Sequence, residues 1–194
     1  DMKQVKDVRK YESLGEVKGG SFTLFKINGR VVFSNGEYFY TYEDMFVNGF
    51  GAKDRDIYRY AEALLLAAEA IAQSGTVAEA APYLAEIKAR ANMEGKTAAE
   101  IAATLPTDKQ AFVEECWKER LRELPFDFKI WDDCVRTGKF PVISKTTKGD
   151  VTFVNLVGAQ NASGYTIKDS DLLWPISPDE LQRNPSLTQN PGYN

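Results

Sequence analysis

The architecture of this 194-residue chain follows most directly from the segment YRYAEALLLAAEA, residues Tyr58–Ala70. Apolar side chains in and just beyond it recur every three or four residues, at Tyr60, Leu64, Ala67, Ala68 and Ile71. That period places them along one face of an α-helix. Ser74-Gly75 predicts the helix end, because glycine is favoured just past a helix C-terminus. We therefore expect an amphipathic helix that packs one face against a neighbour.

Three capping-box patterns predict the helices that follow. A threonine stands three residues before an acid or amide at Thr76-Glu79, Thr97-Glu100 and Thr107-Gln110. In such a box the two side chains satisfy the first backbone N–H groups of a helix. The third helix is expected to end at Pro125, because proline breaks a helix interior. A last helix is expected over about 127–137, closing at Gly138.

These helices are expected to pair as antiparallel hairpins. The pair over 58–92 has about the length of one tetratricopeptide unit. One such pair cannot bury both of its faces, so a second pair over 108–137 is its predicted neighbour. The predicted fold class is mainly α, with tetratricopeptide-like helical hairpins, irregular loops, short β-hairpins and an ordered C-terminal wrap.

Strands are predicted before the helices. Asn28-Gly29 lies between apolar runs at 22–27 and 31–33, which is a hairpin signal because both turn residues tolerate positive φ. A second turn at Asn35-Gly36 leads into 37–42, a run of strong β propensity.

After the helices, Val142-Ile143 and the run 151–157 predict another hairpin. The prolines of the last 20 residues argue against regular structure there, while apolar side chains such as Trp174 predict a wrap packed on the helices. We expect a single domain, 1–194, with a strand and loop segment over 1–53, a helical core over 54–138 and an irregular wrap over 139–194.

Composition excludes several classes of function. The chain carries 24 Lys and Arg against 28 Asp and Glu, a net charge of -4, without a basic block. We therefore expect neither nucleic acid nor anionic membrane as a partner. There is no histidine, which excludes Ser-His-Asp and Cys-His triads, histidine metal sites and histidine general bases. No apolar run has the length of a transmembrane helix, and the start lacks a signal peptide. Because the chain begins with aspartate, we expect it to be processed or a fragment.

The chain has two cysteines, Cys116 and Cys134. Both lie nine residues from Pro125, so helices folded back at this proline could bring them to one level. Two readings stay open: two buried small apolar residues, or one disulfide bridge.

Three segments, taken in order, carry a resemblance to a known family. The first is Tyr58–Ala70; the second is ERLRELPFD at 119–127, followed by Trp131, Asp133 and Arg136-Thr137-Gly138. The third is LWPIS at 173–177, followed by Asn184-Pro185 and QNPGY at 189–193. The ordered set resembles the C-terminal half of the SusD/RagB family, over about residues 58–194.

The resemblance implies a function at a bacterial cell surface. Members are glycan-binding outer-membrane lipoproteins of Bacteroidetes that face the outside, bind oligosaccharide without catalysis or cofactor, and pass it to a SusC-type TonB-dependent transporter. This chain resembles a C-terminal piece, so membrane attachment is expected only through an N-terminal lipid anchor that it lacks. The alternative is a helical-repeat scaffold for protein contact without sugar affinity.

The chain also departs from the family. The family usually has glycine where Phe128 stands, arginine where Ile130 stands, an apolar residue where Asp132 stands and a small residue where Pro125 stands. We therefore expect local packing to differ around 125–132.

Candidate glycan contacts are aromatic, because the C–H faces of pyranose rings stack on exposed aromatic rings. Tyr38, Tyr40 and Tyr42 alternate and so share one face of the predicted strand. Trp131 and Tyr165 are further candidates. For each of them the alternative is packing on the helices.

Charged clusters are interpreted as structural, with no catalytic residue and no metal site. Glutamate and arginine at i, i+3 and i, i+4 usually form ion pairs, as expected for Glu119, Arg120, Arg122 and Glu123. A hydrolase would need two carboxylates at a defined separation, and no compact signature marks such a pair. Asp169-Ser170-Asp171 lacks the glycine and the closing glutamate of a calcium loop, so we expect a solvated turn.

Overall fold

A computed structural model describes residues 56–144, 146–147 and 150–193, together with the backbone of four strands between residues 14 and 40. The chain divides into two compact units, Asp1–Lys129 and Ile130–Asn194. We describe each unit by itself. The predicted division of a single domain into 1–53, 54–138 and 139–194 stays a prediction.

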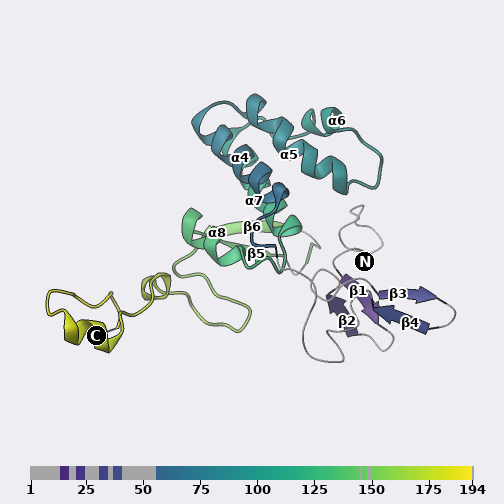
Figure 1. Cartoon of the computed structure of the whole chain (residues 1–194). Helices are drawn as coiled ribbons and strands as arrows, with labels where there is room; N and C mark the ends of the chain where they lie inside the picture. Colours follow the sequence, from purple (N-terminus) through teal and green to yellow (C-terminus); the bar gives the residue numbers. More distant parts are fainter. Residues whose placement is uncertain are drawn as a thin grey trace. The chain divides into compact units, whose positions relative to one another are not determined.

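The helical part of the first unit contains α4 (Tyr60–Ser74), α5 (Val77–Ala91), α6 (Ala98–Ala102) and α7 (Lys109–Glu123). Figure 1 shows α4 beside α5 and α7, and α6 lies against α5. Their shared core is built from small and branched side chains around one buried phenylalanine: Ala61, Leu65, Ala68, Ala72, Ala80, Leu84, Ala85 and Phe112. The mainly-α prediction is confirmed, and the alanines let the helices approach closely.

Two of the three predicted helix starts are confirmed. The Thr76 and Thr97 side chains accept from the backbone N–H of Glu79 and Glu100, which bond back to the threonines. The third prediction is wrong by one residue, because Asp108 caps α7 and accepts from Ala111 N at 2.9 Å. An aspartate is preferred over threonine at this position, so it displaces its neighbour Thr107 as the cap.

The second unit begins with α8 (Ile130–Thr137), which ends at Gly138 with a φ of 67°. The predicted hairpin follows as β5 (Lys139–Ile143) and β6 (Val151–Asn155), antiparallel with Lys139 opposite Asn155. A small core joins these elements to the loop after β6: Cys134, Phe140, Leu156, Ala159, Ile167 and Leu172. The predicted pairing of α7 with α8 stays a prediction.

The C-terminal segment is ordered by its own side chains. Gln189 accepts from Ile176 N at 2.8 Å and donates to Ile176 O at 2.9 Å. Asn190 donates to Trp174 O at 2.6 Å, and the Tyr193 hydroxyl lies 2.9 Å from the carbonyl oxygens of Ser170 and Leu173. We call Gln189, Asn190 and Tyr193 the C-terminal clamp.

Regular structure also occurs among the prolines, contrary to prediction. Besides a 3₁₀ turn η2 (Asp169–Leu172), the segment contains α9 (Pro178–Arg183). Pro178 is its first residue, where a helix has no use for the missing N–H. Ser177 caps this helix by accepting from Glu180 N.

Near the N-terminus, β1 (Leu14–Val17) pairs with β2 (Ser21–Leu24), and β3 (Val31–Ser34) pairs with β4 (Glu37–Tyr40), both antiparallel. The strands on either side of the predicted Asn35-Gly36 turn pair, with Ser34 opposite Glu37, while the two turn residues lie outside the described residues. The predicted pairing across Asn28-Gly29 is wrong, since the two runs pair with other strands. Each strand takes the partner reached through the shorter link, which costs less loop-closure entropy.

The two cysteines are buried free thiols, so the reading without a bridge is confirmed. Burial raises the pKa of Cys116 to about 12 and that of Cys134 to about 11. Neither thiol is a reactive nucleophile at neutral pH. The helices in the described part of the chain also include no bilayer-spanning candidate, since each is too short or too polar.

Candidate functional site

Buried charges from α4 and α7 meet between these helices. Arg120 of α7 lies 3.7 Å from Glu62 of α4, measured from Nη2 to Oε1. Lys129, just after α7, approaches the other oxygen of Glu62 at 3.6 Å. Arg120 and Glu62 are both buried, so the two cations hold a carboxylate that has little contact with water.

A second group joins α5 to α7. Lys88 Nζ lies 2.5 Å from Glu115 Oε1 and 3.5 Å from Glu119 Oε2. Arg122 Nη1 lies 3.2 Å from the same Glu119 oxygen. Burial alone would raise the pKa of Glu115, but the hydrogen bond and charge of Lys88, helped by Arg122, lower that pKa below its ordinary value of 4.5.

A third group fixes the end of α7, and Arg59 is its centre. Arg59 donates to the Glu123 carboxylate at 3.0 Å, to the Glu123 carbonyl at 2.8 Å and to Asp127 Oδ2 at 3.1 and 2.8 Å. Arg90 Nη2 adds a contact of 2.5 Å to Glu123. Although burial opposes it, hydrogen bonds to Asp127 and Glu123 raise the pKa of Arg59.

The predicted structural reading of the charged cluster is confirmed, because Glu119, Arg120, Arg122 and Glu123 all take part in ion pairs. Within the described residues, moreover, no three acidic or cysteine side chains gather in a way that would hold a metal ion. The charges between the helices therefore serve the packing of α4, α5 and α7.

A strained turn follows α7. Phe126 has a φ of 65° and Phe128 a φ of 59°, a backbone region that bulky side chains rarely adopt. The turn is held by Asp127, whose N–H donates to Leu124 O at 3.2 Å and whose carboxylate accepts from Arg59. Phe128, at a position where the resemblance implies glycine, thus has a left-handed backbone conformation. Strain of this kind costs about 1–2 kcal/mol per residue.

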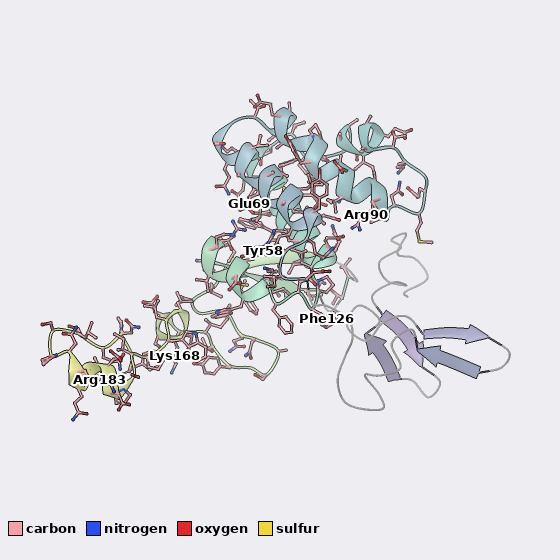
Figure 2. All side chains as sticks on the ribbon, in the orientation of Figure 1. Tyr58, Glu69, Arg90, Phe126, Lys168 and Arg183 are labelled. Atoms are coloured by element: carbon pink, nitrogen blue, oxygen red, sulfur yellow. The ribbon has the colours of Figure 1, made fainter. Side chains whose placement is uncertain are left out.

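Exposed aromatic residues lie in the two segments that the Arg59–Asp127 hydrogen bonds join. The exposed fractions are 75% for Phe128, 39% for Phe126 and 76% for Tyr58, just before α4. Lys129 Nζ lies 4.1 Å from the centroid of the Tyr58 ring, a cation–π contact. Figure 2 labels Tyr58 and Phe126. We call Tyr58, Phe126 and Phe128 the aromatic corner.

The structure places the predicted glycan contacts on separate elements. Tyr38 and Tyr40 lie on β4, opposite Phe33 and Val31, but their side chains and the whole of Tyr42 are outside the described residues. Trp131 is exposed in the first turn of α8.

Tyr165 is also exposed, beside the bridge between Gln160 and Thr166. Its hydroxyl donates to both oxygens of the Asp171 carboxylate, at 3.1 and 2.9 Å. This hydrogen bond raises the pKa of Tyr165. Asp171 also accepts from Lys168 N at 2.8 Å, so the phenol is fixed while its ring stays open. Asp169-Ser170-Asp171 forms the expected turn, as η2.

Several exposed aromatics were missed from the sequence. Tyr60 was predicted on the buried face of α4, but it lies at the first residue of that helix and is 72% exposed. Trp174 was expected to pack in the wrap, but 89% of it is exposed. Asn190 and Tyr193 donate to the carbonyl oxygens of Trp174 and Leu173 and so fix the backbone there. The sequence offered one indication of this conformation, because a residue before proline is kept extended. Phe128 was noted only as a departure from glycine.

The hairpin of α4 and α5 with α7 packed on it places the protein in the class of tetratricopeptide-like helical-hairpin proteins. More specifically, the chain belongs to the SusD family, whose model matches residues 8–193. A solved structure, a SusD superfamily protein from Parabacteroides distasonis ATCC 8503, is 28% identical with a TM-score of 0.58. The match covers 91% of this chain and 34% of that one, so this chain spans about a third of its relative. A comparison with curated proteins found no match.

Proposed function

We propose that this protein is the C-terminal part of a non-catalytic oligosaccharide-binding protein at the bacterial cell surface, which delivers sugar to a SusC-type TonB-dependent transporter. The observation that carries the proposal is membership of the SusD family over residues 8–193. The proposed location is the outer face of the outer membrane, with a lipid anchor on the full-length protein.

The chemistry of the described residues supports binding rather than turnover. Acids between the helices are engaged with cations, for example Glu119 with Lys88 and Arg122. A hydrolase needs two carboxylates, one of them protonated, beside the scissile bond. Exposed aromatic rings suit a sugar, because pyranose C–H faces stack on them. Trp131 and Tyr165, together with Tyr38, Tyr40 and Tyr42, remain the proposed contacts.

Calorimetry against a panel of neutral hexasaccharides tests the proposal: glucan, xylan, mannan and galactan oligomers titrated into the protein. We expect heat with at least one oligomer and no release of reducing ends. Tyr165→Ala should weaken the binding, whereas Tyr83→Ala, on α5, is the matched control and should not. Absence of heat with every oligomer would favour a protein-contact scaffold, and release of reducing ends would favour a hydrolase.

Delivery is tested separately by co-purification with a SusC-type transporter from outer membranes. We expect the tagged full-length protein to retain the transporter in mild detergent. A protein that binds sugar but never retains the transporter would limit the function to capture.

A further inference from the structure

We propose that the C-terminal clamp positions the side chain of Tyr165, and that Tyr193 is the positioning residue, acting through η2 and Asp171. The inference rests on the proposed function, in which Tyr165 is a candidate sugar contact, and adds to it how that contact is held. All of the residues involved lie in the second unit.

The C-terminal segment holds one end of η2. The Tyr193 hydroxyl lies 2.9 Å from the carbonyl oxygens of Ser170 and Leu173, one on each side of Asp171. Gly192, the residue before Tyr193, packs so closely on the Ser170 side chain that it leaves no room for a Cβ. Two consecutive residues of the C-terminal segment thus fix the position of this turn.

Asp171 connects the turn to Tyr165. Its carboxylate accepts from the Tyr165 hydroxyl at 3.1 and 2.9 Å and from Lys168 N at 2.8 Å. Figure 2 labels Lys168, the residue just before η2. Because a hydrogen bond weakens steeply when its angle departs from linearity, a shift of η2 would weaken both of these bonds.

The backbone of Tyr165 is held separately, by the loop that precedes it. Tyr165 N donates to Asn161 Oδ1 at 3.0 Å, and Asn161 N donates to Tyr165 O at 3.0 Å. The loop therefore fixes the main chain, while η2 fixes the hydroxyl at the far end of the ring. Loss of the hydroxyl bond would release the side chain without unfolding the loop.

The clamp and the phenol also lie close together in space, although 28 positions separate Tyr165 from Tyr193. The pKa of Tyr165 is raised first by the hydrogen bond to Asp171, and further by partial loss of water and by the charges of Asp171 and Tyr193. Tyr193 is thus near enough to act on the phenol, and η2 supplies the contacts between them.

Tyr193→Phe tests the inference, because it removes only the hydroxyl that reaches η2. The readout is amide hydrogen exchange of the native protein at pH 7, resolved by residue in NMR spectra. The Lys168 amide, bonded to Asp171, should exchange roughly tenfold faster. The Ile167 amide, bonded to Ala159 O at 2.8 Å, should be unchanged, since only a general loss of stability would speed both amides.

Two further variants complete this experiment. Asp171→Ala removes the acceptor itself and should speed the Lys168 amide at least as much as Tyr193→Phe does. Tyr83→Phe is the matched control, because Tyr83 is 38% exposed and Tyr193 is 37% exposed. It deletes an equally accessible hydroxyl in the other unit and should change neither amide.

Sugar binding gives a second readout, with the hexasaccharide that gives the largest heat with the wild type. Tyr193→Phe should lose part of the affinity that Tyr165→Ala loses. The double variant should bind no more weakly than Tyr165→Ala alone, because both changes act on one contact and their effects are then not additive.

The outcomes distinguish the two proposals. If the wild type binds none of the four hexasaccharides, the proposed function fails, and the exchange of Lys168 by itself decides whether the clamp holds Asp171 and with it Tyr165. If Tyr193→Phe leaves the Lys168 amide unchanged, or speeds it only together with Ile167, the inference is overturned while the proposed function stands. Additive losses of affinity in the double variant, or wild-type affinity in Tyr165→Ala, would overturn the inference as well.

Discussion

Arg120→Ala should destabilise the protein more than any change in an exposed charge. Arg120 is 4% exposed and lies 3.7 Å from Glu62, which is also buried. Removing the guanidinium leaves the Glu62 carboxylate with Lys129 as its remaining neighbour in this group, at 3.6 Å. Removing one member of a buried ion pair costs about 3–5 kcal/mol, because the other charge stays out of water.

The size of the effect follows from that remaining lysine. Since Lys129 still compensates part of the Glu62 charge, we expect the lower end, about 3 kcal/mol. For a chain of this length, 1 kcal/mol shifts the melting temperature by roughly 2–4 °C, so the expected decrease is roughly 6–12 °C. The reasoning attributes this decrease to the isolated carboxylate rather than to the lost side-chain volume.

Thermal unfolding followed by circular dichroism at 222 nm and neutral pH measures the shift. Lys96→Ala is the matched control, because Lys96 forms an exposed pair with Glu94 at 2.7 Å in the same unit and such pairs contribute little. Adding Glu62→Gln to Arg120→Ala should recover part of the loss by removing the isolated charge. An Arg120→Ala protein that melts within 1 °C of the wild type, or a double variant with no recovery, would refute the reasoning.

Three further outcomes are expected. Gly192→Ala should destabilise the C-terminal unit, because φ is +89° and a Cβ would collide with the Ser170 side chain. Gly164→Ala, at φ +83° with open space around it, is the control and should reduce the hydrogen-exchange protection of the same unit less. Equal losses of protection would exclude the collision. Stability should fall as pH drops below the ordinary glutamate value of 4.5, because the pKa of Glu115 is lowered in the folded state and the unfolded chain therefore binds more protons. In Glu115→Gln, the melting temperature plotted against pH from 7 to 3 should fall less steeply than in the wild type. An unchanged steepness would contradict this. Cys116 and Cys134, buried with raised pKa values, should resist Ellman's reagent at pH 8 in the native protein and both react in denaturant, whereas fast native reaction would contradict the burial.

The sequence was informative wherever local chemistry decides the structure. The apolar period of Tyr60–Ile71 and the Thr76 and Thr97 boxes predicted α4, α5 and α6, because helix starts depend on side chains within four residues. The pairing of β3 with β4 on either side of residues 35–36 also follows from local sequence. The prediction of the start of α7 was wrong because Thr107 and Asp108 are adjacent and either can cap the same helix.

Long-range contacts were beyond such reasoning. The spacing of Glu119 and Arg122 predicts their ion pair, but nothing in it indicates that Lys88 and Arg59 would also meet the acids of α7. The aromatic corner has the same origin: Tyr58 and Phe128 are 70 positions apart, and their segments are joined by the Arg59–Asp127 bonds and the Lys129–Tyr58 contact. The exposure of Trp174 likewise depends on backbone bonds made from residues 190 and 193.

The C-terminal clamp has a consequence for anyone shortening this chain. The side chains of Gln189, Asn190 and Tyr193 supply the hydrogen bonds that a neighbouring strand would ordinarily provide to an extended segment. The loop around Trp174 is therefore held by side-chain hydrogen bonds instead of a β-ladder. Trimming the last six residues would leave those carbonyls to water and loosen a stretch some 15 positions upstream. The segment over residues 189–193 is therefore a structural component of its unit and a poor place for a cut or an inserted tag.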